Sequence, residues 1–131
     1  MDIREHIEYW INGANDDIEV AKSLFNSGYY LWSLFIGHLV LEKILKALFV
    51  ANTKSIEVPR SHNLLYIAEL SGLELDLVRK DLYFKINDFN IEARYPDKKS
   101  KLYSIVDKEF ANNYLEKIEE NVQWIKSMLK Y

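Results

Sequence analysis

The most apolar part of the chain is the stretch YYLWSLFIGHLVLEKILKALFVA, residues 29–51, and it limits how the rest can fold. Its length alone would be enough to span a membrane. Charged side chains interrupt it, however, and each charge near the centre of a span costs about 2.5–3.5 kcal/mol on insertion scales. The stretch therefore predicts a buried helix at the centre of a soluble bundle. The interrupting polar residues are His38, Glu42, Lys43 and Lys46.

Three of these residues, His38, Glu42 and Lys46, follow one another at four-residue steps and share one face of the predicted helix. One hypothesis is that His38 and Glu42 form an acid–base pair or half of a metal site. The other is a hydrogen-bonded polar stripe or interface, in which Glu42 pairs with Lys46 or with a group across the interface. We favour the stripe and expect no metal, because the additional ligands that a metal site needs are not visible in the pattern.

Apolar residues recur at three- and four-residue steps on both sides of the central stretch, which predicts amphipathic helices packed around it. Glycine and proline are scarce, with four and two copies, so an ordered chain is expected. The whole chain is predicted to be one all-α domain, an antiparallel up-and-down bundle of about five helices. The expected helices cover approximately residues 1–25, 29–51, 62–70, 73–94 and 107–129.

Local signals mark several helix ends. Ser61 is the expected N-cap of the short third helix, and Gly72 suits its C-terminus. The fourth helix should end at Arg94 or just before it, because Tyr95 precedes a proline and is pushed out of helical geometry. The face of this helix that is expected to be buried carries Leu75, Val78, Leu82, Ile86, Phe89 and Ala93.

Charge and cysteine content narrow the possible functions. The formal net charge of −3 gives no overall attraction to nucleic acid, so any anion site must be local. The absence of cysteine excludes disulfides, thiolate catalysis and cysteine-based zinc sites. The N-terminal sequence MDIREHIEYW is polar and charged, unlike a signal peptide. We therefore expect a cytoplasmic protein that has no membrane segment and no cofactor.

Four cations stand within eight residues at the end of the fourth expected helix: Arg94, Lys98, Lys99 and Lys101. The arginine guanidinium can bind phosphate or carboxylate with two parallel hydrogen bonds, which lysine cannot do. Together with Tyr95, this cluster is a candidate site for a nucleotide or another anion. The simpler interpretation is a solvated helix end, where a cation is favourable for local reasons.

His62 follows a proline-containing loop and stands at the start of the short third helix. That position suits a group that binds a ligand, and we include His62 among the candidate nucleotide-binding residues. The alternative is a capping or first-turn residue that packs under the loop, because a positive helix end tends to keep a histidine neutral.

Several segments of the chain, taken in their order along the sequence, resemble the HEPN domain, a family named for nucleotide binding in higher eukaryotes and prokaryotes. The most specific are LEKILKAL at 41–48, the Pro-x-x-His of Pro59 and His62, and ARYPD at 93–97. The resemblance covers nearly the whole chain and implies a helical bundle that dimerises. It also implies a partner, since many members pair with a minimal nucleotidyltransferase in toxin–antitoxin systems. The three Trp, nine Tyr and six Phe also favour a homodimer, because aromatic residues are enriched in interfaces.

Many HEPN proteins are metal-independent ribonucleases with an Arg-x(4–6)-His motif, and this chain lacks that spacing. No histidine stands five to seven residues after Arg4, Arg60, Arg79 or Arg94. The resemblance therefore implies a non-catalytic module that binds nucleotide or RNA, with no assigned catalytic residue. The alternative hypothesis is a divergent ribonuclease in which His38 or His62 replaces the missing histidine.

Overall fold

The computed structural model describes residues 1–95 and 104–131, and within them the chain forms five α-helices. The predicted all-α helical bundle is confirmed. Lys98, Lys99 and Lys101 of the cationic cluster lie outside the described residues. The helices are α1 (Ile3–Asn26), α2 (Tyr30–Thr53), α3 (Leu64–Leu70), α4 (Leu77–Arg94) and α6 (Lys108–Met128).

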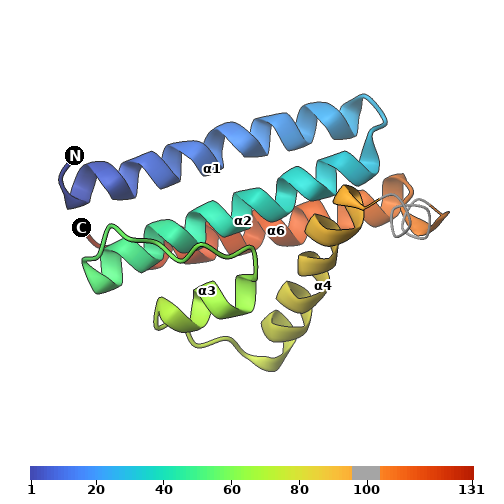
Figure 1. Ribbon diagram of the computed structural model, residues 1–131. Coiled ribbons are helices and arrows are strands. Elements are labelled where there is room, and N and C mark those ends of the chain that lie inside the picture. Colours follow the sequence, from blue (N-terminus) through green and yellow to red (C-terminus); the bar gives the residue numbers. More distant parts are fainter. Residues whose placement is uncertain (96–103) are drawn as a thin grey trace.

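Helix α2 lies at the centre of the bundle and contacts each of the other four helices. Helices α1, α2 and α6 run side by side, whereas α4 crosses them steeply and the short α3 packs below α2 (Figure 1). The connection between α2 and α3 turns back along α2. Both chain ends lie at one end of the bundle, where the guanidinium of Arg4 donates to the carbonyl oxygen of Tyr131 at 3.0 Å.

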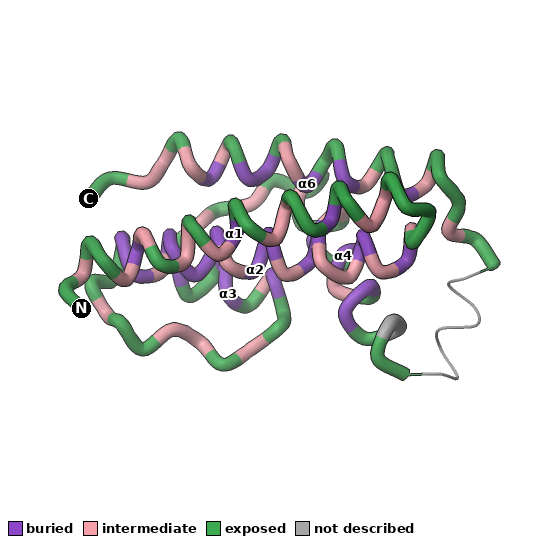
Figure 2. The backbone as a smooth tube through the Cα atoms, turned by 90° about the horizontal axis from the view of Figure 1, so that it is seen from above, coloured by how far each residue is buried: buried purple, intermediate pink, exposed green. Residues whose placement is uncertain are grey.

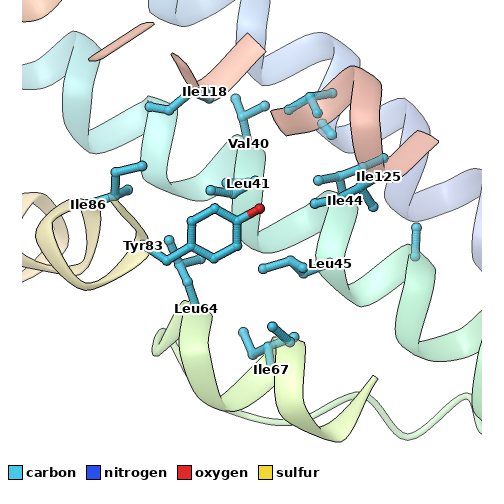
Figure 3. Packing of buried hydrophobic residues seen from close by; sticks show 14 of the residues in the cluster. Val40, Leu41, Ile44, Leu45, Leu64, Ile67, Tyr83, Ile86, Ile118 and Ile125 are labelled. Carbon is cyan, nitrogen blue, oxygen red and sulfur yellow. The ribbon is translucent and has the colours of Figure 1, made fainter. Parts of the chain in front are cut away.

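Burial follows the sequence pattern, with purple and pink segments concentrated in α2 and green on the outer faces of α1 and α6 (Figure 2). The core surrounds Tyr83 of α4, which is fully buried among Leu41, Leu45 and Leu64 (Figure 3). Its hydroxyl donates to Asn121 Oδ1 of α6 at 2.8 Å. Burial raises the pKa of Tyr83 well above its ordinary value, so this phenol is a neutral link between α4 and α6.

Two predicted helix starts are wrong, and a side-chain cap explains each difference. Helix α3 is capped by Asn63, whose Oδ1 accepts from the amides of Leu65 and Tyr66, so Ser61 lies outside it. Helix α4 begins at Leu77 because Asp76 Oδ1 accepts from the Arg79 amide at 2.8 Å. An acceptor at this position satisfies an amide that has no partner within the helix. The predicted end of α4 at Arg94 is confirmed.

The buried face of α4 differs from the predicted one. Ile86 and Phe89 are buried as expected, but Val78 is 79% exposed and Tyr83 takes the central position. Val78 lies in the first turn of α4, and the buried residues of this helix begin at Tyr83. The notch at Gly37 is filled by α6, since a Cβ there would lie 2.9 Å from Ile118 Cδ1. Among the described residues, no helix is long and apolar enough to cross a membrane.

Candidate functional site

A row of polar residues lies where α2, α4 and the connection before α3 meet, and we call it the polar seam. On α2 its members are four residues apart and therefore point the same way. The other members come from elements that are distant in sequence and contact this stripe. The polar seam consists of His38, Glu42 and Lys46 of α2, His62 of the connection, and Asn87, Asn90 and Arg94 of α4.

His38 is fully buried in the middle of the polar seam, and both of its ring nitrogens have partners. Nε2 donates to the carbonyl oxygen of His62 at 2.8 Å, and Nδ1 lies 3.4 Å from the donating Nδ2 of Asn90. Because a carbonyl only accepts, this pairing places the proton on Nε2. Burial lowers the pKa of His38 to about 4, so the imidazole is neutral at physiological pH and holds the connection against α2.

The Glu42 carboxylate accepts hydrogen bonds from two side chains, one at each oxygen. Its Oε2 accepts from Lys46 Nζ at 3.0 Å, and its Oε1 accepts from His62 Nδ1 at 2.8 Å. Both Glu42 and Lys46 are buried, with 5% and 8% of their surface exposed. A buried carboxylate requires such partners, because an unpaired buried charge is strongly unfavourable. Lys46 Nζ also lies 5.3 Å from the centre of the Trp10 ring.

His38 and Glu42 do not form the acid–base pair that one sequence hypothesis described. His38 Nδ1 is 4.0 Å from Glu42 Oε1, which is beyond hydrogen-bond distance. The histidine that Glu42 contacts is His62, twenty residues further along the chain. No group of three His, Cys, Asp or Glu side chains suited to a metal ion occurs in the part of the chain that the structure describes.

His62 is the exposed member of this group, with 52% of its side-chain surface accessible. Because Nδ1 donates to the Glu42 carboxylate, Nε2 is the nitrogen that can accept a hydrogen bond when the ring carries a single proton. Nε2 has no hydrogen-bond partner among the described residues. The result is an imidazole of fixed orientation and tautomer whose acceptor nitrogen is available to a ligand.

Two asparagines of α4 that were not among the predicted site residues support the polar seam, Asn87 at the residues after His62 and Asn90 at the His38 ring. Asn87 Oδ1 accepts from the Leu64 amide at 2.9 Å, and Asn87 Nδ2 donates to Asn63 Oδ1 at 3.0 Å. Asn90 contacts His38 one turn further along α4. The only sequence signal was their spacing, which places both on the same side of α4 as Arg94.

Arg94 is exposed at the last position of α4, and its guanidinium lies 5.9 Å from the centre of the Phe35 ring of α2. It has no carboxylate partner among the described residues. Tyr95 is 57% exposed and extended, with φ −111° and ψ 117°. The arginine at this helix end is therefore an accessible cation with a fork of hydrogen-bond donors.

The structure separates the candidate residues into two ends of the polar seam. His62, grouped with Arg94 in the sequence analysis, contacts Glu42 instead, whereas Arg94 contacts Phe35. Phe35 and Glu42 are seven residues apart on one face of α2, so these ends are about 10 Å apart along the helix axis. Phe35, which connects Arg94 to α2, was also missed, because an aromatic ring in an apolar run gives no distinct signal.

Within the described residues, the chain is a small all-α bundle in which Arg94 and His62 are the exposed members of the polar seam. The family model of the HEPN domain matches residues 7–128, nearly the whole chain. The chain therefore belongs to the HEPN family, whose members are nucleotide-binding and ribonuclease-type helical modules. It has no significant match among curated proteins or among solved structures.

Proposed function

We propose that this chain is a non-catalytic HEPN binding module that holds a phosphate of a nucleotide or RNA at Arg94. The observation that carries the proposal is the exposed Arg94 guanidinium, held over Phe35 at the end of α4 without an acidic partner in the described chain. An arginine in this state keeps its fork of donors available for two parallel bonds to phosphate. Three lysines follow within seven residues in the sequence, so this part of the chain carries further positive charge.

The binding function is tested by Arg94→Lys, which keeps the charge and removes the fork. Titration of the purified protein with ribonucleotides and a short RNA should show weaker binding, by about tenfold for one lost charge-assisted bond. Lys98→Ala, Lys99→Ala and Lys101→Ala should each weaken binding less and reduce its salt dependence. Arg4→Lys, at the other end of the bundle, is the matched control and should bind like the parent.

Parent and Arg94→Lys proteins that bind equally, or a parent that binds neither ligand, would leave Arg94 as a solvated helix end. The same titration in increasing salt separates a phosphate contact from non-specific attraction, since each phosphate neutralised adds to the slope of log affinity against log salt.

A divergent metal-independent ribonuclease remains the second candidate, because His62 and Glu42 are arranged like a general base and its orienting carboxylate. Two features favour the binding function. His38 has both ring nitrogens engaged, and His62 is about 10 Å along α2 from the Arg94 contact, further than hydrogen-bond reach. We expect no cleavage of a generic RNA by protein free of contaminants. Cleavage that His62→Ala abolishes would establish the enzyme instead.

We also propose that the chain forms a homodimer through the exposed face of α4. Leu77, Phe84 and Ile91 recur there at seven-residue steps and are 83%, 61% and 43% exposed. The equal spacing on either side of Phe84 makes this stripe self-complementary in an antiparallel pair of α4 helices, as a two-fold interface requires. Light scattering at micromolar concentration should show a dimer for the parent and a monomer for Phe84→Glu. A monomeric parent would refute the proposal.

The pairing with a minimal nucleotidyltransferase and the cytoplasmic location are also part of this proposal, and both rest on the family resemblance. Co-expression with a minimal nucleotidyltransferase from the same genome, followed by size-exclusion chromatography, tests the pairing directly. Elution of the two chains at separate volumes would count against it.

A further inference from the structure

Three successive contacts line the polar seam beside helices α2 and α4. From one contact to the next, the residue numbers rise along α2 and fall along α4. Arg94 lies over Phe35, and Asn90 contacts His38. One turn further, Asn87 contacts the residues directly after His62. The separation between the Arg94 end and the His62 end can therefore be measured along either helix.

Both helices give the same separation. On α2, Phe35 and Glu42 are seven residues apart, and on α4, Arg94 and Asn87 are also seven residues apart. At 1.5 Å per residue, each interval corresponds to about 10 Å. The groups between the two ends are buried and already paired, since His38 and Asn90 are 0% and 4% exposed. Arg94 and His62 are therefore the two members of the polar seam that are exposed to solvent.

The two exposed ends have different and complementary chemistry. Arg94 offers hydrogen-bond donors and a positive charge. His62, with its Nδ1 proton donated to Glu42, offers an acceptor nitrogen. A ligand that satisfies both must carry an anionic group at one end and a hydrogen-bond donor about 10 Å away. A nucleoside phosphate meets this requirement, because a phosphate stands at one end and the N–H or exocyclic amine donors of the base stand at the other.

We propose that His62 is a second ligand contact, whose Nε2 accepts a hydrogen bond from the base of a nucleoside phosphate bound at Arg94. The inference rests on the proposed function and deepens it, since it adds a second contact and gives the direction of the ligand along the polar seam. Glu42 acts as a positioning residue, because it fixes the tautomer and the orientation of His62 without reaching the ligand.

Isothermal titration separates the two contacts. The probes are the four ribonucleoside 5′-monophosphates and inorganic phosphate, titrated into the full chain. His62→Ala should weaken binding of the tightest nucleotide about three- to tenfold, as expected for one net hydrogen bond, and leave inorganic phosphate unchanged. Arg94→Lys should weaken both. His6→Ala removes a histidine of α1 and should match the parent.

The outcomes distinguish this inference from the proposed function. Weaker binding in Arg94→Lys with unchanged nucleotide binding in His62→Ala would overturn the His62 contact and leave the phosphate site intact. Equal losses of nucleotide and inorganic phosphate in His62→Ala would also overturn it. If the parent binds none of the probes, both proposals are refuted together.

Nitrogen-15 spectra of labelled histidine give a readout that a purely structural role would not change. The parent should show His62 protonated at Nδ1, and saturation with the tightest nucleotide should shift its Nε2 resonance. Glu42→Gln should reduce the fraction of the Nδ1-protonated tautomer and weaken nucleotide binding, while inorganic phosphate binding is retained. A parent with His62 protonated at Nε2, or an Nε2 resonance unmoved at saturation, would overturn the proposal.

Discussion

Acidification from pH 7 to pH 5 should destabilise the folded chain through His38, which has no exposed surface. Burial lowers its pKa from 6.5 to about 4, and the nearby Glu42 carboxylate only partly opposes this effect. Between these two values the unfolded chain binds a proton at His38 and the folded chain does not. The free energy of unfolding therefore falls as the pH falls through this window, and this contribution is intact above it.

The size of the effect follows from the two pKa values. Protonation of the unfolded state at His38 lowers the free energy of unfolding by about 2 kcal/mol between pH 7 and pH 5, and by about 3 kcal/mol below both values. A protonated His38 ring would also be unfavourable in the folded core. Nδ1 faces the amide nitrogen of Asn90, and a proton on Nδ1 would place two donors against each other.

Urea unfolding at pH 7 and pH 5 measures this contribution when the parent is compared with His38→Gln. Glutamine does not titrate, and its amide nitrogen can donate to the same His62 carbonyl. The other ionisable groups are the same in both proteins, so the comparison isolates the contribution of His38. The parent should lose about 2 kcal/mol more than the variant. An equal loss in both would show that His38 is not neutral and buried as described.

Four further substitutions test the packing around α2. Ile44→Ala should lower the free energy of unfolding by about 2–5 kcal/mol because Ile44 is fully buried. Leu39→Ala, at a half-buried position, should lower it less. Equal losses in urea unfolding would contradict the assignment of Ile44 to the core. Gly37→Ala should cost about 1–3 kcal/mol by overpacking against α6. The added methyl group of Gly13→Ala meets only the flexible Lys43 side chain, so this change should raise the free energy of unfolding by up to about 1 kcal/mol. If both glycine substitutions raised the melting temperature, the close contact between Gly37 and α6 would be refuted.

The central position of α2 could be predicted from the sequence, because it follows from the residues themselves. A helix that is apolar on nearly every side is stable only when other helices cover it. The end of α4 could be predicted for a similar reason, since the restriction on Tyr95 comes from the adjacent proline. Both features depend on neighbours in the chain or on burial alone, and both agree with the structure.

The starts of α3 and α4 show the limit of local signals. Ser61 and Asn63 are both suitable caps, and the choice of Asn63 coincides with its hydrogen bond to Asn87 of α4. Residues 73–76 are compatible with a helix, but Asp76 caps α4 and leaves them outside it. Such alternatives differ by about 1 kcal/mol locally, so tertiary contacts decide between them.

The candidate site was decided by the tertiary structure. The sequence placed His38, Glu42 and Lys46 on one face, but it could not show that Glu42 contacts His62 rather than His38. That contact exists because the connection after α2 turns back along the helix, where hydrogen bonds to His38 and Asn87 hold it. These pairs join residues 20 to 24 positions apart, and helical periodicity carries no information about which distant side chains meet.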